Sequence, residues 1–183
     1  MPRIFTIGHS NRQWNEFISL LQDNLVDVVV DVRRYPGSKV SPQFNKEQMT
    51  KELEKKNIEY INIEKLGGRR KKIATERSIG NCNSGWKNSS FRAYADYMTT
   101  TPFKEGINEI LSLMTQYNNL VVMCAEALPW RCHRRMIADY LSMLEGVSVY
   151  NIINCKQQPG PHELTLFARL TGDKIVIYPE TYT

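Results

Sequence analysis

The chain has 183 residues, of which 42% are hydrophobic and 23% are charged, and we expect one globular domain over residues 1–183 with a single core. No apolar stretch approaches the ~20 residues that span a membrane, which excludes a membrane-spanning protein, and we expect no membrane partner. The net charge of +5 permits a partner that bears phosphate groups but does not require one.

Strand-like and helix-like patterns alternate through the first third of the chain. Apolar residues recur at helical spacing at Trp14, Phe17 and Leu21, whereas the run VDVVVDV over 26–32 is typical of a strand covered on both faces. Asn45 is a candidate N-cap for the helix that follows it. The predicted elements are a strand over 3–7, a helix over 13–25, a strand over 26–32, a helix over 46–57 and a strand over 59–63.

The rest of the chain begins with the longest predicted loop and then resumes the alternation. This loop covers 67–89, is polar and basic, and has a length that is typical of functional loops. Ser90 is the candidate N-cap of the next helix, and the motif PHEL at 161–164 signals a short helix. The predicted elements are helices from 90 and from 102 to about 117, a strand over 120–123, a helix over 132–144, a strand over 147–153 and a final strand in KIVIYP.

The order of the elements predicts an α/β fold in which helices flank a mostly parallel sheet on both faces, a Rossmann-like arrangement of three layers. Parallel strands present their carboxyl ends at one edge of the sheet, where ligands bind in open α/β folds. We expect three of these ends to converge on one site. They carry His9 and Ser10 after the first strand, Asp31 and Arg33 at the second, and Cys124 and Glu126 at the fourth.

The segment CAEALPWRCHRR over 124–135 holds the densest group of reactive side chains. Cys124 is a candidate nucleophile or a small core residue, and the neighbouring carboxylate of Glu126 favours the first interpretation. Cys132 opens a helix, where the helix N-terminus and basic neighbours are expected to lower the pKa of its thiol. Glu126 is a candidate acid–base group or an ion-pair partner of Arg33, and His133 is a candidate acid–base group or a helix-end residue. The predicted catalytic residues are Cys124, Glu126, Cys132 and His133.

Arginines near the same strand ends are candidate ligands for an anionic small molecule, because a guanidinium donates to phosphate or carboxylate in a fixed fork. These are Arg33, Arg131 and Arg134, with His9, Ser10 and Asp31 beside them. Asp31 and Arg33 lie two apart on one strand, so they share a face and are able to pair instead. A second basic group consists of Arg69, Arg70, Lys71 and Lys72. These residues either contact nucleic acid or form a solvated loop. His162 joins the site only if the C-terminal segment folds back over it.

No metal or cofactor motif is evident, and we expect neither a metal nor a cofactor. Cys124, Cys132 and His133 offer three ligands, and their spacing matches no common structural zinc site. The chain has no GxGxxG after a strand and no GxxxxGK[ST]. Arg131 lies one residue too far from Cys124 for the protein-phosphatase signature.

Cysteine usage and the N-terminal sequence indicate the compartment. The start MPRIFTIGHS lacks the apolar region of a secretory signal. The four cysteines, Cys82, Cys124, Cys132 and Cys155, show no disulfide-framework spacing. We therefore expect reduced thiols in a cytoplasmic protein, and the oligomeric state stays open.

Six segments occur in a characteristic order: TIGHSN, DVRRYPGSKVSPQFN, LGGRR, FRAYADYM, VVMCAEALPWRCHRRMIADYL and PHELTLFARLTGDKIVIYP. Together they resemble the DUF488 family of bacterial and archaeal proteins over about 4–179. The resemblance implies a single α/β domain and supplies no activity, because the family is named for its unknown function. It also adds Ser38 and Gly68 to the candidate binding residues. The family's motif positions then fall on His9, Ser10, Asp31, Arg33, Pro36, Ser38, Gly68, Cys124, Glu126, Cys132, His133 and Arg134.

Three functions compete on this pattern. The favoured one is an intracellular cysteine-dependent hydrolase or transferase for a phosphorylated or nucleotide-like substrate, because ionisable groups cluster at the strand ends. The second is a non-catalytic domain that binds nucleic acid or a nucleotide through its basic residues. The third is a thiol redox or metal sensor built on Cys124 and Cys132.

Overall fold

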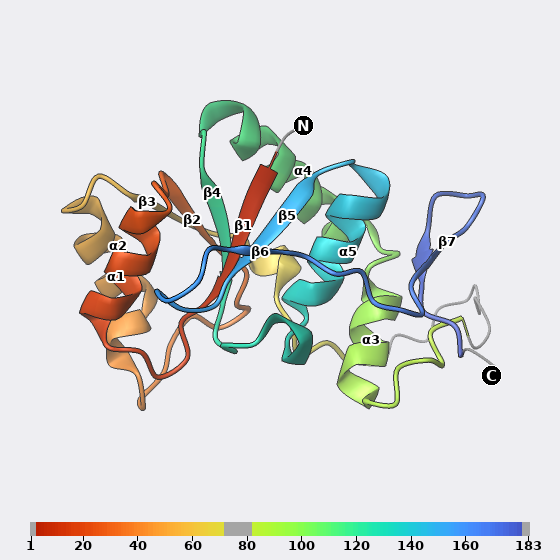
Figure 1. The fold of residues 1–183 in the computed structure, drawn as a ribbon. Coiled ribbons are helices and arrows are strands. Elements are labelled where there is room, and N and C mark those ends of the chain that lie inside the picture. Colours follow the sequence, from red (N-terminus) through yellow and green to blue (C-terminus); the bar gives the residue numbers. More distant parts are fainter. Residues whose placement is uncertain (1–2, 72–81, 181–183) are drawn as a thin grey trace.

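The structure is a computed structural model that describes residues 3–71 and 82–180. A mostly parallel sheet forms the centre of its fold (Figure 1). Its strand order is β3-β2-β4-β1-β5-β6, and only β6 runs antiparallel to its neighbour. The strands are β1 (Arg3–Gly8), β2 (Val28–Asp31), β3 (Glu59–Asn62), β4 (Leu120–Cys124), β5 (Ser148–Ile152) and β6 (Gly160–Pro161). A separate antiparallel pair consists of β7 (Arg169–Leu170) and β8 (Val176–Ile177).

Helices cover both faces of this sheet, which confirms the predicted three layers (Figure 1). One face packs against α1 (Trp14–Asp23) and α2 (Lys46–Glu54). The other face packs against α3 (Ser89–Tyr97), α4 (Thr101–Gln116) and α5 (Arg134–Leu144). Short 3₁₀ turns occur at η1 (Pro42–Phe44), η2 (Glu64–Leu66) and η3 (Pro129–Arg131).

The valine run of β2 shows why the sheet is buried on both sides. Val28 and Val30 belong to the core under α3, α4 and α5, whereas Val29 belongs to the core under α1 and α2. All three side chains are fully buried. Successive side chains of a strand point to opposite faces, so a continuous apolar run fits only a strand that is covered twice.

The topology creates a crevice at the carboxyl ends of the central strands. β1 and β4 are neighbours, with Gly8 paired to Cys124. The chain leaves β1 for α1 on one face and leaves β4 for η3 and α5 on the other. In open α/β sheets, ligands bind where the connections of adjacent strands diverge in this way. The fold therefore places its most favourable binding position beside His9 and Cys124.

The structure corrects several predicted details of the helices. The cap of α3 is Asn88 rather than Ser90, because the Asn88 side chain accepts hydrogen bonds from two main-chain amides of the first turn. Asn45 does occupy the N-cap position of α2, but its side chain accepts from the amide of Ser38 instead. The short helix expected at 161–164 is wrong, since Gly160–Pro161 pairs with β5 as an edge strand. The last predicted helix begins at Arg134 rather than at Cys132.

None of the helices in the described part of the chain is long and apolar enough to cross a bilayer.

Candidate functional site

A cavity of about 350 Å³ lies at the carboxyl ends of β1, β2 and β4, where the topology places the crevice. It brings together residues that are far apart in sequence, from the end of the first strand to the start of the last long helix. The lining residues are His9, Arg33, Arg34, Tyr35, Gly37, Ser38, Gly68, Arg69, Cys124, Ala125 and His133. No Asp or Glu is among these described lining residues, so the ionisable wall groups are imidazoles, guanidiniums, a phenol and a thiol.

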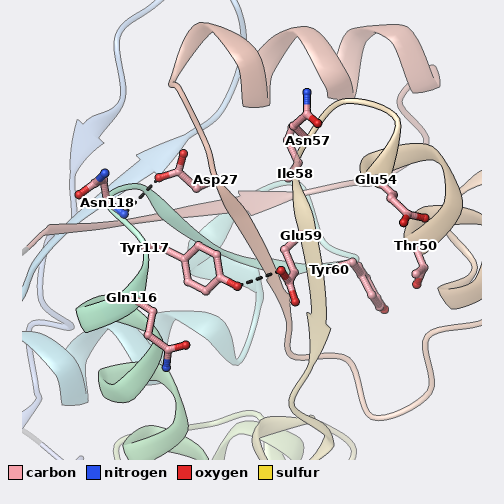
Figure 2. Close-up of a pocket in the computed structure, with 10 residues that line it drawn as sticks. All are labelled: Asp27, Thr50, Glu54, Asn57, Ile58, Glu59, Tyr60, Gln116, Tyr117 and Asn118. Carbon is pink, nitrogen blue, oxygen red and sulfur yellow. Dashed lines mark hydrogen bonds between the residues drawn. The ribbon is translucent and has the colours of Figure 1, made fainter.

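A larger cavity of about 650 Å³ opens at the opposite, amino-terminal edge of the sheet (Figure 2). Several of its polar groups already have partners in the protein. Tyr117 donates a hydrogen bond to Glu59, and the Asp27 carboxylate accepts from the main-chain amides of Asn118 and Asn119. No thiol or imidazole lines it, so the chemistry of the described residues favours the smaller cavity.

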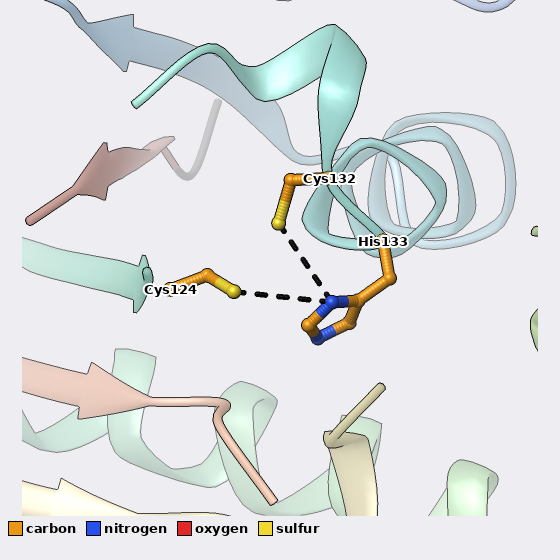
Figure 3. A group of neighbouring side chains, drawn as sticks. All are labelled: Cys124, Cys132 and His133. Carbon is orange, nitrogen blue, oxygen red and sulfur yellow. Dashed lines mark hydrogen bonds between the residues drawn. The ribbon is translucent and has the colours of Figure 1, made fainter. Parts of the chain in front are cut away.

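Cys124, Cys132 and His133 form a compact cluster at one wall of the smaller cavity (Figure 3). Both sulfurs face Nδ1 of His133, at 3.9 Å for Cys124 and 3.7 Å for Cys132. Cys124 is only 6% exposed and Cys132 only 5%. Cys124 and His133 line the cavity, whereas Cys132 does not. Cys124 is therefore the thiol that a bound molecule meets.

The orientation of His133 follows from its second nitrogen. Nε2 lies 3.3 Å from the carbonyl oxygen of Val32, which accepts hydrogen bonds only, so Nε2 carries the proton. In the neutral ring Nδ1 is then the unprotonated nitrogen and faces both sulfurs, and a proton gained at Nδ1 would place the charge of an imidazolium beside them. His133 occupies the N-cap position of α5 and thus adjoins the electropositive end of that helix.

The two thiols differ in acidity, and the difference is opposite to the sequence-based expectation for Cys132. The hydrogen bond from Cys132 lowers the pKa of the Cys124 thiol, and the charges of His133 and Arg134 act in the same direction against burial. The same hydrogen bond, together with burial and the nearby Cys124, raises the pKa of Cys132. Cys124 is therefore the more acidic member of the pair.

A buried ion pair supports the neighbouring wall. The Asp31 carboxylate is fully buried and accepts from Nε and Nη2 of Arg33 and from the hydroxyl of Tyr60. Nη1 of Arg33 lies 3.0 Å from Nε2 of His9, and Nδ1 of His9 donates to the carbonyl of Ser10. Burial and the charge of Arg33 lower the pKa of His9, and burial followed by the charge of Asp31 raises that of Tyr60. Arg33 therefore lines the cavity with a positive charge that the carboxylate of Asp31 already neutralises.

Several predicted site residues lie outside the cavity. Glu126 is exposed and accepts from the amide of Leu128, so the alternative in which Glu126 pairs with Arg33 is wrong and Asp31 takes that place. Ser10 and Arg131 do not line the cavity, and Arg131 is exposed. Arg134 is only 1% exposed and donates to the carbonyls of Glu126 and Ala127. It thereby fixes the connection between β4 and α5.

The basic run after Gly68 divides between two environments. Arg69 lines the cavity. Arg70 stacks its guanidinium 3.9 Å from the ring centre of Tyr97 and donates to the carbonyls of η2 and Gly67. Lys71 is exposed, and Lys72 lies outside the described residues.

Sequence reasoning missed Arg34, Tyr35, Gly37 and Ala125 as lining residues. The first three belong to the turn that follows β2, and their signal was their position directly after the carboxyl end of a strand. Ser38 and Gly68, which only the family resemblance suggested, do line the cavity. A side chain at Gly68 would place its Cβ 3.0 Å from Nδ1 of His133, so a glycine there leaves room for the imidazole.

Gly8→Ala is expected to lower the free energy of unfolding by about 2 kcal/mol. An added Cβ would lie 1.9 Å from the carbonyl oxygen of Glu126 and 2.7 Å from the Cα of Ala127, and these main-chain atoms cannot move without displacing the strand end. Urea denaturation measures the loss. Gly172→Ala is the control, because its Cβ meets nothing within 4 Å. Equal stability of the two variants would contradict the close approach at Gly8.

Comparison with known proteins identifies a family. The sequence model of the family described as "Domain of unknown function DUF488" matches residues 13–141. This range includes the Cys124–His133 cluster but is shorter than the resemblance over 4–179 suggested, since β1 and the segment after α5 fall outside it. Neither a curated protein nor a solved structure matches the chain significantly. The match covers well over half of the sequence, and the chain therefore belongs to the DUF488 family.

Proposed function

We propose that the protein is an enzyme that binds a phosphorylated or nucleotide-like substrate in this cavity and attacks it with Cys124. The observation that carries the proposal is the shared lining of one cavity by a thiol, two imidazoles and three arginines. An anion-binding module has no need of the thiol and imidazole. A merely structural cysteine has no need of the arginines.

The arginines suit different parts of the anion. Arg33 is buried and balanced by Asp31, so it contributes orientation more than net charge. Arg34 uses one nitrogen on the carbonyl of Arg69, which leaves other donors of its planar fork for a ligand. Arg69 is exposed at the rim. A cavity of about 350 Å³ lies at the small end of ligand sites, which favours a small phosphorylated molecule or a mononucleotide.

The chemistry would proceed through a covalent intermediate on Cys124. The thiol proton passes to Nδ1 of His133, and the sulfur lone pair attacks the electrophilic phosphorus or carbon of the substrate. The bond to the leaving group breaks with its electron pair, and the leaving group takes the proton from His133. Water or an acceptor alcohol then gives a proton to Nδ1 of His133 and displaces the thiolate, which takes that proton back and regenerates the enzyme. Hydrolysis and transfer differ only in this last nucleophile.

The nucleic-acid hypothesis loses part of its basis in the structure. Arg134 and Arg70, which it needs for phosphate contacts, donate to main-chain carbonyls. The guanidinium of Arg135 lies 5.8 Å from the ring centre of Trp86. Strong binding of oligonucleotides that survives removal of Arg34 and Arg69 would restore that hypothesis.

The proposal predicts that anion binding and thiol protection occur together. Inorganic phosphate, a hexose phosphate and a nucleoside monophosphate are titrated by calorimetry at low ionic strength, into protein treated with reductant and chelator. Arg34→Ala and Arg69→Ala should each weaken the tightest ligand about tenfold, since one charge-assisted hydrogen bond contributes about 1.5 kcal/mol. Arg3→Ala is the control, because this exposed arginine lies at the opposite end of β1.

The same ligand should slow the alkylation of Cys124 by iodoacetamide, with the modified residue located by mass spectrometry. The exposed Cys155 reports any general effect of the ligand on the reagent. Cys124→Ser should keep the affinity and abolish turnover of any ester that the wild type hydrolyses. A bound anion that leaves alkylation of Cys124 unchanged, or turnover that survives Cys124→Ser, would contradict the proposal.

A further inference from the structure

We propose that Cys124, Cys132 and His133 form a zinc site whose fourth coordination position opens into the arginine-lined cavity. Nothing in the family description assigns a metal, and the inference does not depend on the catalytic role proposed above. It starts from ligand type, since two sulfurs and one imidazole nitrogen are ligands that zinc prefers among the common divalent ions.

The distances between the three ligand atoms fit a tetrahedral ion. Zinc bonds of about 2.3 Å to sulfur and about 2.0 Å to nitrogen, at tetrahedral angles, place a sulfur and a nitrogen about 3.6 Å apart. The observed separations from Nδ1 are 3.7 Å and 3.9 Å. Two sulfurs on the same ion would be about 3.8 Å apart, and all three atoms lie within 4.8 Å of one another. Both sulfur–nitrogen separations therefore lie within a few tenths of an ångström of those in a zinc-bound site.

The surroundings also match those of a metal-binding histidine. Such a histidine binds through one nitrogen and donates its other N–H to a carbonyl or carboxylate, which fixes the tautomer. His133 has this arrangement, with Nε2 against the Val32 carbonyl and Nδ1 toward the sulfurs. The main-chain amide of Arg134 donates to the sulfur of Cys132 at 3.5 Å, a contact that stabilises negative charge on that sulfur. The buried Arg134 side chain holds the β4–α5 connection that carries both cysteines into place.

The chain supplies three ligands in the described residues, as catalytic zinc sites do, and the fourth position of such sites takes water or substrate. Cys124 and His133 line the cavity, so a fourth ligand enters from that side. An oxygen of the anion held by Arg34 and Arg69 is the ligand that fits there. Coordination would release both thiol protons to solvent, which is one of the ways in which enzymes activate a thiol. His133 would then act as a ligand rather than as a base.

The test uses cobalt as a spectroscopic substitute for zinc in a variant with only two thiols. Cys82→Ser/Cys155→Ser leaves Cys124 and Cys132 as the remaining cysteines of the chain. This protein, reduced and stripped with a chelator, is titrated with Co²⁺. We expect one Co²⁺ per chain, with the visible absorption of a tetrahedral ion and thiolate-to-metal charge transfer, and displacement of the cobalt by one equivalent of Zn²⁺.

Single substitutions in this background identify the ligands. Cys124→Ser, Cys132→Ser and His133→Ala should each weaken the metal at least 100-fold, whereas Arg34→Ala should leave the affinity in the absence of anion within threefold. Circular dichroism checks that each variant is folded. Absence of the tetrahedral spectrum in the folded two-thiol protein, or an undiminished spectrum after Cys124→Ser, would overturn the site. Anion binding without metal binding would contradict the zinc site and leave the proposed function standing. Metal binding without anion binding would support the zinc site and contradict the proposed function.

Discussion

Asp31→Asn is expected to lower the free energy of unfolding by about 3–5 kcal/mol, the cost of removing one partner from a buried ion pair. The substitution keeps the shape of the side chain and removes its charge. The guanidinium of Arg33, which is 7% exposed, would then remain buried without a counter-charge. Tyr60 would lose a charged acceptor at 2.6 Å. Urea denaturation followed by circular dichroism measures the change.

Two further variants separate the charge effect from a general loss of packing. Asp23→Asn makes the same chemical change at an exposed position at the end of α1 and should alter stability by less than about 0.5 kcal/mol. Arg33→Met combined with Asp31→Asn removes both charges, and it should cost less than the sum of the two single substitutions. Additive losses would show that Asp31 and Arg33 do not act as a pair.

Much of the fold could be predicted because its signals are local. The run of valines in β2 fits only a strand buried on both faces, and the helical spacing of Trp14, Phe17 and Leu21 gives α1. The alternation of such elements then favours a parallel sheet. The predictions of the helix caps were wrong because the side chains concerned are able to hydrogen-bond to more than one partner. Asn88, Asn45 and Ser90 are all good cap residues, but the Asn45 side chain accepts from Ser38 in the preceding loop, and Asn88 rather than Ser90 accepts from the first-turn amides of α3.

The site was predicted in part because topology alone brings strand ends together. β1, β2 and β4 are neighbours in the sheet, so His9, Arg33 and Cys124 had to meet. The direction of each side chain in the connecting loops was not predictable from position. Glu126 follows Cys124 by two residues yet points to solvent, and Arg134 follows Cys132 by two residues yet is buried. Neither direction follows a strand or helix period, because both depend on the irregular path between β4 and α5.

The proposed zinc site was not expected from the sequence, because only three ligands could be counted there. Three ligands at an unfamiliar spacing argue against a structural zinc ion, which needs four. They do not argue against an ion that leaves one position for a substrate. The structure supplied what spacing could not, namely the approach of both sulfurs to one nitrogen and the contact of the other nitrogen with Val32. The expectation of no metal is therefore replaced by a proposal with a direct spectroscopic test.

Asp139→Asn is expected to lower the free energy of unfolding by about 4 kcal/mol, and to loosen the C-terminal segment more than the sheet. Asp139 is fully buried on α5 and accepts from His162, from the amide and hydroxyl of Thr165 and from the hydroxyl of Tyr178. Each buried donor left without its charged acceptor costs about 1–3 kcal/mol, and such losses are not additive within one network. Hydrogen exchange of the segment over 160–180, alongside urea denaturation, measures both effects.

This network explains why His162 stays out of the cavity even though the C-terminal segment does fold back onto α5. Nε2 of His162 lies 2.8 Å from the carboxylate of Asp139, and His162 lines a different cavity. Asp139 lies within the range matched by the family, whereas its partners in the C-terminal segment lie beyond it. The same helix that presents His133 to the thiols thus holds the last part of the chain. Asp173→Asn, at an exposed position, is the matched control. Faster exchange across β1 and β4 than across 160–180 in Asp139→Asn would show that Asp139 supports the sheet rather than the C-terminal segment.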